Sequence, residues 1–311
     1  MDEIRIPNDA TYAPVALTDL IAGAPLVSRL VLGATLPGRV ISAAALGMYL
    51  GSALRDWLAR QDVRWIDFEI QFGADVHFLQ PTPDEVRRRE IRRLAERMND
   101  DFTAERIPRD ELARQVNRHL TAYVASITGQ RVHTSSEVRD FTATKLLLPF
   151  AQGVCDMLSG DVALFRDTGI FEPHVLGHEF THRKGYFKEL HAQVLSYLAL
   201  TASGEPLLVQ AARAERLYRQ LRVLAGDDVR AYHDLIDNVA LRPELAHAFD
   251  RFAAPSRPGG VGGELMKALI DQRLKLTGQN GLSDYDVGFT DFLWTFSQSP
   301  SARQDRSLAA A

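Results

Sequence analysis

Gly177-His178-Glu179-Phe180-Thr181-His182 is the stretch around which the rest of the chain must be arranged. It contains the pattern HExxH, and residues four apart lie on the same face of an α-helix, so the imidazoles of His178 and His182 point in one direction. Three neighbouring positions are apolar: Val175, Leu176 and Phe180. Apolar neighbours are typical of a buried helix. The pattern therefore predicts a buried helix whose two histidines bind one metal ion, with Glu179 beside it.

A metal ion held by two histidines needs a third protein ligand, and the following segment offers Glu189 and His191. A straight helix would carry Glu189 about 16 Å from His178, at about 1.5 Å per residue, so the chain must bend. Gly185 predicts the bend, because it accepts backbone angles forbidden to its neighbours, and a second helix can return from about residue 187.

On this second helix, Glu189 and His191 point about 200° apart, so only one of them can face the metal. The face of Glu189 carries small or polar residues that leave room for an ion: Ala192, Gln193 and Ser196. We predict Glu189 as the third ligand. His191 is then a surface histidine or one that supports a ligand.

Two imidazoles, one carboxylate and an open position for water form the donor set of catalytic zinc sites. Zinc held in this way polarises a carbonyl group and lowers the pKa of water toward about 7, and Glu179 would take the proton and pass it to a leaving amine. A second donor for the oxyanion has four open candidates: His174, Tyr197, Tyr232 and His233. The sequence thus predicts a zinc-dependent hydrolase, a metallopeptidase with a peptide or protein substrate.

Two other classes of protein remain open. Two histidines and a carboxylate are also the ligands of non-haem iron oxygenases, although an oxygenase has no need for Glu179. A non-catalytic zinc scaffold would enclose the ion with a fourth ligand such as His174 or His191. Metzincins are excluded, because their third histidine would fall at position 188, which is Lys188.

The motif resembles known families. His178-Glu179-x-x-His182 followed by Glu189-x-x-Ala192 resembles the gluzincin pattern of membrane zinc peptidases such as the CAAX-prenyl and heat-shock membrane proteases. Gln193 replaces the aspartate of their E-x-x-A-D motif, and the spacing here is much shorter. A closer resemblance is to an uncharacterised bacterial family of membrane-anchored HExxH proteins, in which HExxHxxG, ExxA and Tyr-Leu-Ala follow in the same register, here Tyr197-Leu198-Ala199.

The resemblance extends to the C-terminal end of the chain. Residues 274–282 and Tyr285 resemble the closing segment of the bacterial family, so the similarity spans roughly residues 60 to 297. It implies the same zinc ligands as the motif. A tyrosine-rich stretch expected after the metal helices is replaced by Leu207-Leu208-Val209-Gln210, so the resemblance implies no catalytic tyrosine there.

Composition predicts a main domain large enough to bury a core. The chain has 311 residues, of which 46% are apolar, and its net charge of −4 argues against nucleic acid as a partner. Cys155 is the only cysteine, which excludes an intrachain disulfide, and its apolar surroundings predict a small core residue. We expect an apolar N-terminal segment over 1–60, a helical metallopeptidase-like domain over 61–300 and a disordered tail over 301–311.

The N-terminal segment leaves two interpretations open. Its acidic start predicts no signal peptide, and the longest uncharged run, Val40 to Leu54, has 15 residues against the roughly 20 that span a bilayer. Residues 21–54 either pack on the enzyme domain or contact a membrane surface, so the protein is cytoplasmic or membrane-associated. Arg29 and Arg39 favour packing, because charges are costly in lipid.

The predicted fold class is mainly α with a minor β component. Helices are expected over 84–99, 109–127, 142–158, 173–184, 187–201, 205–224, 228–239, 243–252, 262–277 and 284–297. Asp161–Arg166 is predicted either as a short edge strand that could align an extended peptide or as a buried loop. Residues 255–260 are predicted as a loop.

Overall fold

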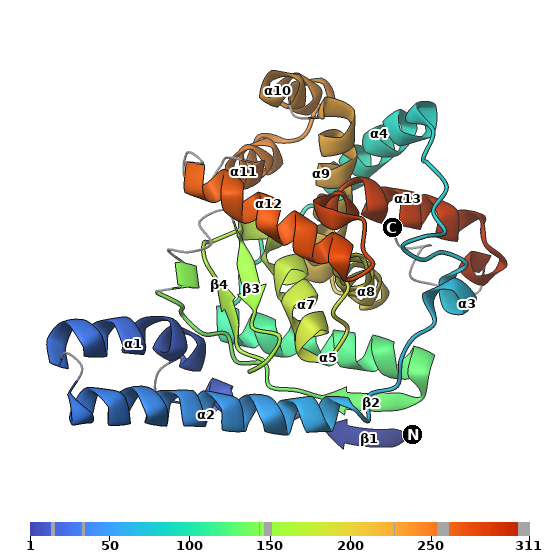
Figure 1. The fold of residues 1–311 in the computed structure, drawn as a ribbon. Coiled ribbons are helices and arrows are strands. Elements are labelled where there is room, and N and C mark those ends of the chain that lie inside the picture. The colour runs from blue at the N-terminus through green and yellow to red at the C-terminus, as the bar shows by residue number, and fades with distance from the viewer. Residues whose placement is uncertain are drawn as a thin grey trace.

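The computed structural model describes residues 1–13, 16–32, 35–142, 144–145, 151–226, 228–253 and 261–303. It confirms the mainly α fold class, with strands confined to two small sheets. Helix α7 (Glu172–Arg183) lies at the centre and packs against α5 (Arg109–Thr128), α8 (Glu189–Ala202) and α9 (Pro206–Ala225), as Figure 1 shows. All twelve residues of α7 are buried, so the HExxH motif lies in the interior of the molecule.

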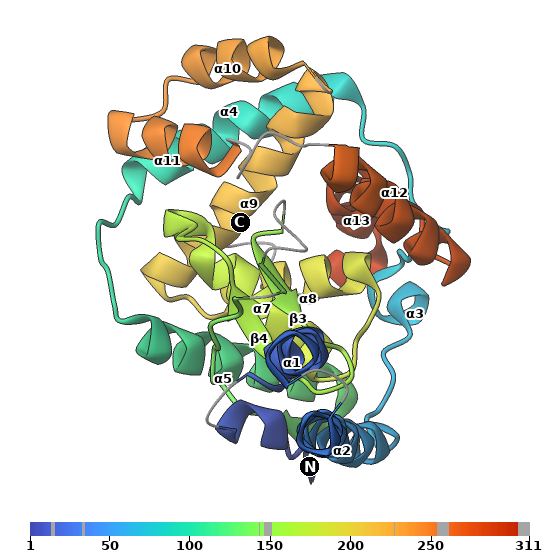
Figure 2. The same cartoon turned by 60° about the vertical axis from the view of Figure 1, so that its left-hand side comes forward.

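Other helices surround this centre. They are α1 (Leu17–Leu32), α2 (Leu36–Arg60), α3 (Phe68–Phe72), α4 (Asp84–Asp100), α10 (Val229–Asn238), α11 (Pro243–Ala253), α12 (Val261–Leu276) and α13 (Val287–Gln298). Short 3-10 turns are η1 (Asp9–Tyr12), η2 (Gly169–Phe171), η3 (Gly281–Tyr285) and η4 (Pro300–Arg303). Helices α4, α10 and α11 lie together beyond α9, whereas α12 and α13 lie beside α8 (Figure 2).

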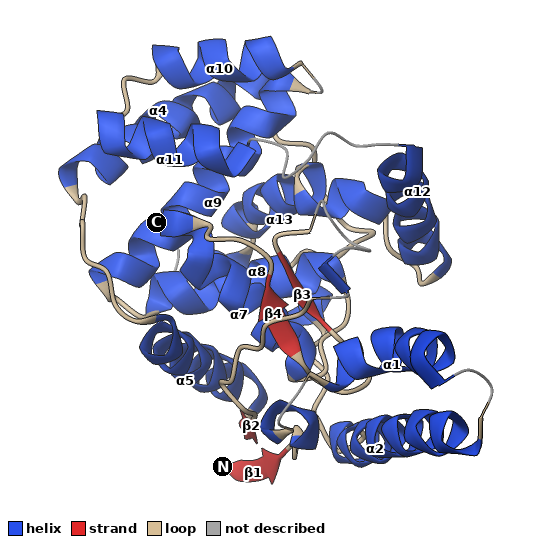
Figure 3. Cartoon of the chain, turned by 90° about the vertical axis from the view of Figure 1, so that its left-hand side faces the viewer, coloured by secondary structure: helices blue, strands red, loops and turns tan. Residues whose placement is uncertain are grey.

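The two sheets differ in the relative direction of their strands. Strand β1 (Asp2–Arg5) pairs in parallel with β2 (Gln130–His133), which ties the N-terminus to the chain after α5. Strands β3 (Gly153–Cys155) and β4 (Val162–Leu164) form an antiparallel pair that packs against α7. Figure 3 shows both pairs as minor elements among helices.

Helix boundaries follow local signals. Proline stands before or at the first residue of α4, α5, α9 and α11, where its fixed φ suits the start of a helix. Gly129, with φ 68°, ends α5. Except over 142–158 and at the start of α13, the predicted helices agree with the observed ones to within two residues. The last predicted helix, 284–297, begins three residues too early, because residues 281–285 form η3 and α13 starts at Val287.

The predicted helix over 142–158 is wrong in its described part. Residues 153–155 form β3, while 143 and 146–150 lie outside the described residues. A side chain at Gly153 would place its Cβ 3.1 Å from Glu179 Oε1, so glycine lets this strand approach α7 closely. The apolar run has no periodicity that distinguishes a helix from a short strand, and packing against α7 decides between them.

The predicted strand at 161–166 is present as β4, the partner of β3 in a two-stranded sheet. Its residues are all buried, and Ala163 lies between β3 and a parallel bridge to Arg139. The edge that faces the site belongs to β3. The predicted loop over 255–260 lies outside the described residues. Of the predicted tail over 301–311, residues 301–303 belong to η4, and residues 304–311 lie outside the described residues.

Helices α1 and α2 pack on each other as a hairpin that extends from one side of the molecule (Figure 1). The base of α2 contacts the rest of the chain, but much of its length exposes apolar side chains, among them Leu46, Leu50, Leu54 and Trp57. Among the described helices, none combines the length and the hydropathy needed to cross a membrane.

Candidate metal centre and cleft

Three side chains meet at one point. His178 Nε2 lies 3.1 Å from His182 Nε2 and 3.1 Å from Glu189 Oε2, and His182 Nε2 lies 3.2 Å from the same carboxylate oxygen. Within the part of the chain that the structure describes, these three form the one group of histidine, cysteine or acidic side chains that could hold a metal ion. The structure thus brings together the three ligands predicted from the sequence.

Hydrogen bonds on the far side of each ring decide which nitrogen carries a proton. His182 Nδ1 lies 2.9 Å from the carbonyl oxygen of Tyr186, which only accepts, so Nδ1 must be the donor. His178 Nδ1 lies 3.0 Å from Gln193 Oε1 and must donate as well. In a neutral ring of this tautomer Nε2 carries a lone pair, and both Nε2 atoms face each other and Glu189.

Three lone pairs that converge at about 3 Å repel one another unless a cation lies between them. Burial alone would lower the pKa of His182, but the carboxylate of Glu189 outweighs burial and raises this pKa to about 9. The pKa of Glu189 lies well below its ordinary value, because the two histidines outweigh the effect of burial. The donor set therefore favours positive charge at this point, and two imidazoles with a carboxylate fit zinc.

Gln193 is oriented by a chain of polar groups behind the histidine. Its Nε2 donates to Glu215 Oε1 at 3.0 Å, which leaves Oε1 as the atom that faces His178. Burial would raise the pKa of Glu215, but Arg219 and His174 outweigh it and lower this pKa to about 2. The sequence placed Gln193 on the face of Glu189 and at the position of an aspartate, but it indicated no partner for this side chain. In the structure, Gln193 connects the buried carboxylate of Glu215 to His178 through two hydrogen bonds. These bonds fix the orientation of the His178 ring.

Two glycines allow the ligand helices to come together. A Cβ at Gly177 would lie 2.3 Å from Ser196 Oγ, so only glycine lets α7 approach α8 this closely. Gly185 has a φ of 105° and turns the chain between the helices, as predicted. The first residue of α8 is Glu189, whose amide donates to Gln279 Oε1 at 2.7 Å. Its carboxylate is thereby aimed at the histidines of the preceding helix.

Glu179 lies beside this centre at the edge of β3. Burial raises its pKa, and the two neighbouring histidines and the amide of Cys155 oppose that rise. The amide of Cys155 is a hydrogen-bond partner of the carboxylate. Cys155 itself is buried, as predicted, and burial raises the pKa of its thiol well above the ordinary value. Glu179 thus combines a raised pKa with a position next to the candidate ligands, which suits a general base.

Tyr285 completes the centre and was not among the four predicted oxyanion donors. Its hydroxyl donates to Glu189 Oε2 at 2.6 Å, and its ring lies 5.7 Å from that of His178. Burial and the Glu189 carboxylate raise the pKa of Tyr285 well above its ordinary value, so the phenol keeps its proton. The one signal in the sequence was its place in the C-terminal segment of the resemblance.

The other predicted candidates lie elsewhere, with one exception. Tyr197 hydroxyl accepts from Arg216, Tyr232 packs against Tyr218, and His233 lies on the surface beside Asp250. His174 lines the cavity, but its Nδ1 lies 3.9 Å from Glu215 and it does not join the ligand group.

His191 points away from the centre. Its Nε2 lies 2.7 Å from Asp75, and its ring stacks on Phe68 at 3.5 Å. His191 is therefore a buried histidine with a structural partner, not a surface residue. With His174 and His191 both outside the group, the described residues provide three ligands rather than the four of an enclosed structural zinc site.

A cavity of about 560 Å³ opens from the ligands. One wall is residues 151–158, which include β3, and the opposite wall is formed by α12 and η3, with Ile270, Leu274 and Leu282. Glu179 and Tyr285 line the same cavity. The metal ligands thus face a space large enough for several residues of a peptide.

Strand β3 directs alternate backbone groups away from β4, on the side of the cavity. Phe165 donates to Gln152 and Asp156 donates to Asp161, so the bonded pairs of the β3–β4 ladder fall at 152, 154 and 156. The amides and carbonyls of Gly153 and Cys155 consequently point away from β4, and the amide of Cys155 reaches Glu179. The edge that can pair with an extended chain is β3 rather than the predicted 161–166.

Comparison with known protein families, curated proteins and solved structures finds no match to this chain.

Proposed function

We propose that this protein is a zinc-dependent metallopeptidase. The observation that carries the proposal is the convergence of His178, His182 and Glu189 at the wall of a cavity that also contains Glu179. Bound zinc would supply a Lewis acid that polarises the scissile carbonyl and lowers the pKa of water to about 7. His178, His182 and Glu189 would hold the ion, and all three line the cavity that would admit water and substrate.

Two residues of the chain would provide proton transfer and stabilisation of the oxyanion. Glu179 accepts the proton of the attacking water and delivers it to the leaving amine, which its raised pKa favours. Tyr285 keeps its proton and is the hydrogen-bond donor nearest to the ligands, so it would stabilise the oxyanion. Removal of one such donor typically costs about 100-fold or more in kcat.

A peptide is the substrate class that the cleft supports best. The outward amide and carbonyl of Gly153 and the outward carbonyl of Cys155 can pair with an extended peptide, which would place its scissile bond beside Glu179. The apolar side chains of α12 on the opposite wall would receive side chains of the substrate. Neither feature is needed for an oxygenase or for a zinc scaffold.

Metal analysis combined with one substitution tests the proposal. Purified protein is expected to contain about one equivalent of zinc and to cleave members of a mixed peptide library followed by mass spectrometry. Glu179→Gln should keep the zinc, since both imidazoles remain, and lose roughly 100- to 10,000-fold in kcat. The exposed Glu85 provides the matched control, and Glu85→Gln should change neither quantity. Iron instead of zinc, or full activity of Glu179→Gln, would refute the proposed mechanism.

A further inference from the structure

The loop of residues 156–160 continues directly from β3. Asp156, Met157 and Leu158 line the cavity, and the preceding residue, Cys155, is a hydrogen-bond partner of Glu179. A displacement of this loop would therefore move the outward edge of β3. Contacts that fix this loop therefore also fix β3, the strand that would pair with the peptide substrate.

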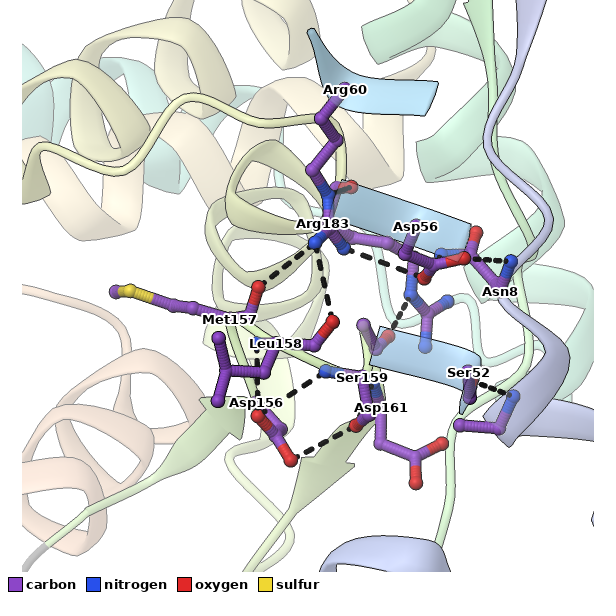
Figure 4. Close-up of polar contacts among 12 residues, drawn as sticks. Asn8, Ser52, Asp56, Arg60, Asp156, Met157, Leu158, Ser159, Asp161 and Arg183 are labelled. Atoms are coloured by element: carbon purple, nitrogen blue, oxygen red, sulfur yellow. Dashed lines mark hydrogen bonds and ion pairs between the residues drawn. The ribbon is translucent and has the colours of Figure 1, made fainter. Parts of the chain in front are cut away.

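The N-terminal hairpin holds the first residue of the loop. Tyr49 of α2 donates its hydroxyl to the carboxylate of Asp156 at 2.9 Å, and Thr18 of α1 donates to the same oxygen at 2.8 Å. The same carboxylate accepts from the hydroxyl of Ser159 and from the amides of Leu158 and Ser159, which folds the loop on itself, as Figure 4 shows. Both helices of the hairpin thus bind the residue at which the strand ends.

Arg60, the last residue of α2, ties the same loop to the metal-ligand helix. Its buried guanidinium donates to the carbonyl oxygens of Met157 at 2.9 Å and Arg183 at 3.3 Å. Arg183 directly follows the ligand His182, and its own Nε donates to the carbonyl of Gly160 at 2.6 Å. Figure 4 shows the two guanidinium groups beside the loop. The two arginines therefore fix the loop at both ends relative to α7.

We infer that Tyr49 and Arg60 are positioning residues for the substrate strand, so that the hairpin completes the peptide-binding cleft. This inference rests on the proposed function. The hairpin leaves much of its apolar surface exposed, while polar groups from it converge on one cavity-lining loop. A segment that served only to cover the core would bury apolar surface against it instead.

Two hydroxamates separate this role from metal binding. Acetohydroxamate reports only the metal centre, whereas a peptide hydroxamate also uses the edge of β3. Tyr49→Phe removes a single hydroxyl from a partly buried ring, and a lost hydrogen bond to a charged group corresponds to roughly tenfold or more. We expect Tyr49→Phe to weaken the peptide hydroxamate about tenfold, with unchanged zinc content and unchanged affinity for acetohydroxamate.

Arg60→Met should weaken the affinity for the peptide hydroxamate by a larger factor than Tyr49→Phe, again with unchanged affinity for acetohydroxamate. Arg60→Lys should lose less of this affinity, because an ammonium can still donate to one carbonyl. Tyr12→Phe is the matched control, since Tyr12 is exposed on η1 and does not line the cavity. Amide hydrogen exchange adds a readout that needs no ligand. Exchange over residues 152–158 should be faster in Tyr49→Phe and unchanged in α8.

These measurements distinguish failure of the positioning role of the hairpin from failure of the proposed function. Unchanged peptide affinity together with unchanged exchange over 152–158 would overturn the inference, as would an equal loss of affinity for both hydroxamates. If the wild-type protein bound neither hydroxamate, the proposed function would fail. Hydrogen exchange would then still decide whether the hairpin positions the strand.

Discussion

The helix pair α7–α8 and the helix pair α1–α2 use their residues in opposite ways. In α7–α8, charged and polar side chains are buried, and Arg183 and Lys184 immediately after the metal motif have no exposed surface. In α2, leucines and a tryptophan lie about half exposed. Buried polar groups are costly unless they are paired, so their concentration in one place supports the proposed functional site. Exposed apolar groups indicate a surface that contacts something else.

The two pairs meet at the loop 156–160, where α2 and α7 each supply an arginine. This loop is a boundary between the interior that holds the ligands and the hairpin that extends from it.

The largest effect is expected from loss of the third ligand. Glu189→Ala removes a carboxylate that both histidines face, so zinc affinity should fall by at least about 1,000-fold, more than the roughly 10- to 100-fold of an outer partner. His191→Ala should keep the metal, although it leaves a space beside Phe68 and lowers the melting temperature. Zinc titration of both variants with a competing chelator measures this difference. Loss of metal in His191→Ala alone would transfer the ligand role to that residue.

A smaller effect is expected at the boundary, where Asp161 is buried next to Arg183. Burial raises the pKa of Asp161 to about 6, against the opposing effect of Arg183 and Arg139. The folded state then binds this proton more tightly than the unfolded state, so the stabilisation is present below pH 4 and is lost as the pH rises through 6. Asp161→Asn removes that dependence and should gain about 1.5 kcal/mol relative to the wild type between pH 5 and pH 8.

Urea unfolding at the two pH values gives the measurement, with Asp100→Asn at the exposed end of α4 as the control. A difference between variant and wild type that does not change with pH would show that Asp161 ionises normally in the folded protein.

The smallest effect is expected on the exposed face of the hairpin. Residues 20–54 contain two arginines and no acidic residue, and Leu50 is 53% exposed. The full-length protein should therefore float with vesicles that contain anionic lipid, and Leu50→Ser should reduce its partition about fivefold, roughly 1 kcal/mol. Leu276→Ser is the matched control, because Leu276 is exposed on α12. No flotation, together with aggregation after deletion of residues 21–54, would favour packing of this region on the enzyme domain.

The contacts of Tyr285 and Glu215 with the site could not be predicted from the sequence. The ligands lie within 12 residues of one another, and helical periodicity with one glycine bend was enough to select Glu189 over His191. Tyr285 reaches the same carboxylate from 96 residues away. Glu215 lies 22 residues beyond Gln193 on another helix. No local pattern connects such residues, because their contact depends on how α8, α9 and η3 pack.

The sequence by itself determined the metal motif, the bend at Gly185, the third ligand candidate and most helix boundaries, because helical geometry and capping act over only a few residues. Only the tertiary structure decided that residues 153–155 are a strand, that this strand is the edge facing Glu179, and that the hairpin binds its end. These features depend on contacts between distant segments, such as Tyr49 with Asp156 across 107 residues. A short apolar run is compatible with helix or strand, and the surface against which it packs selects one of them.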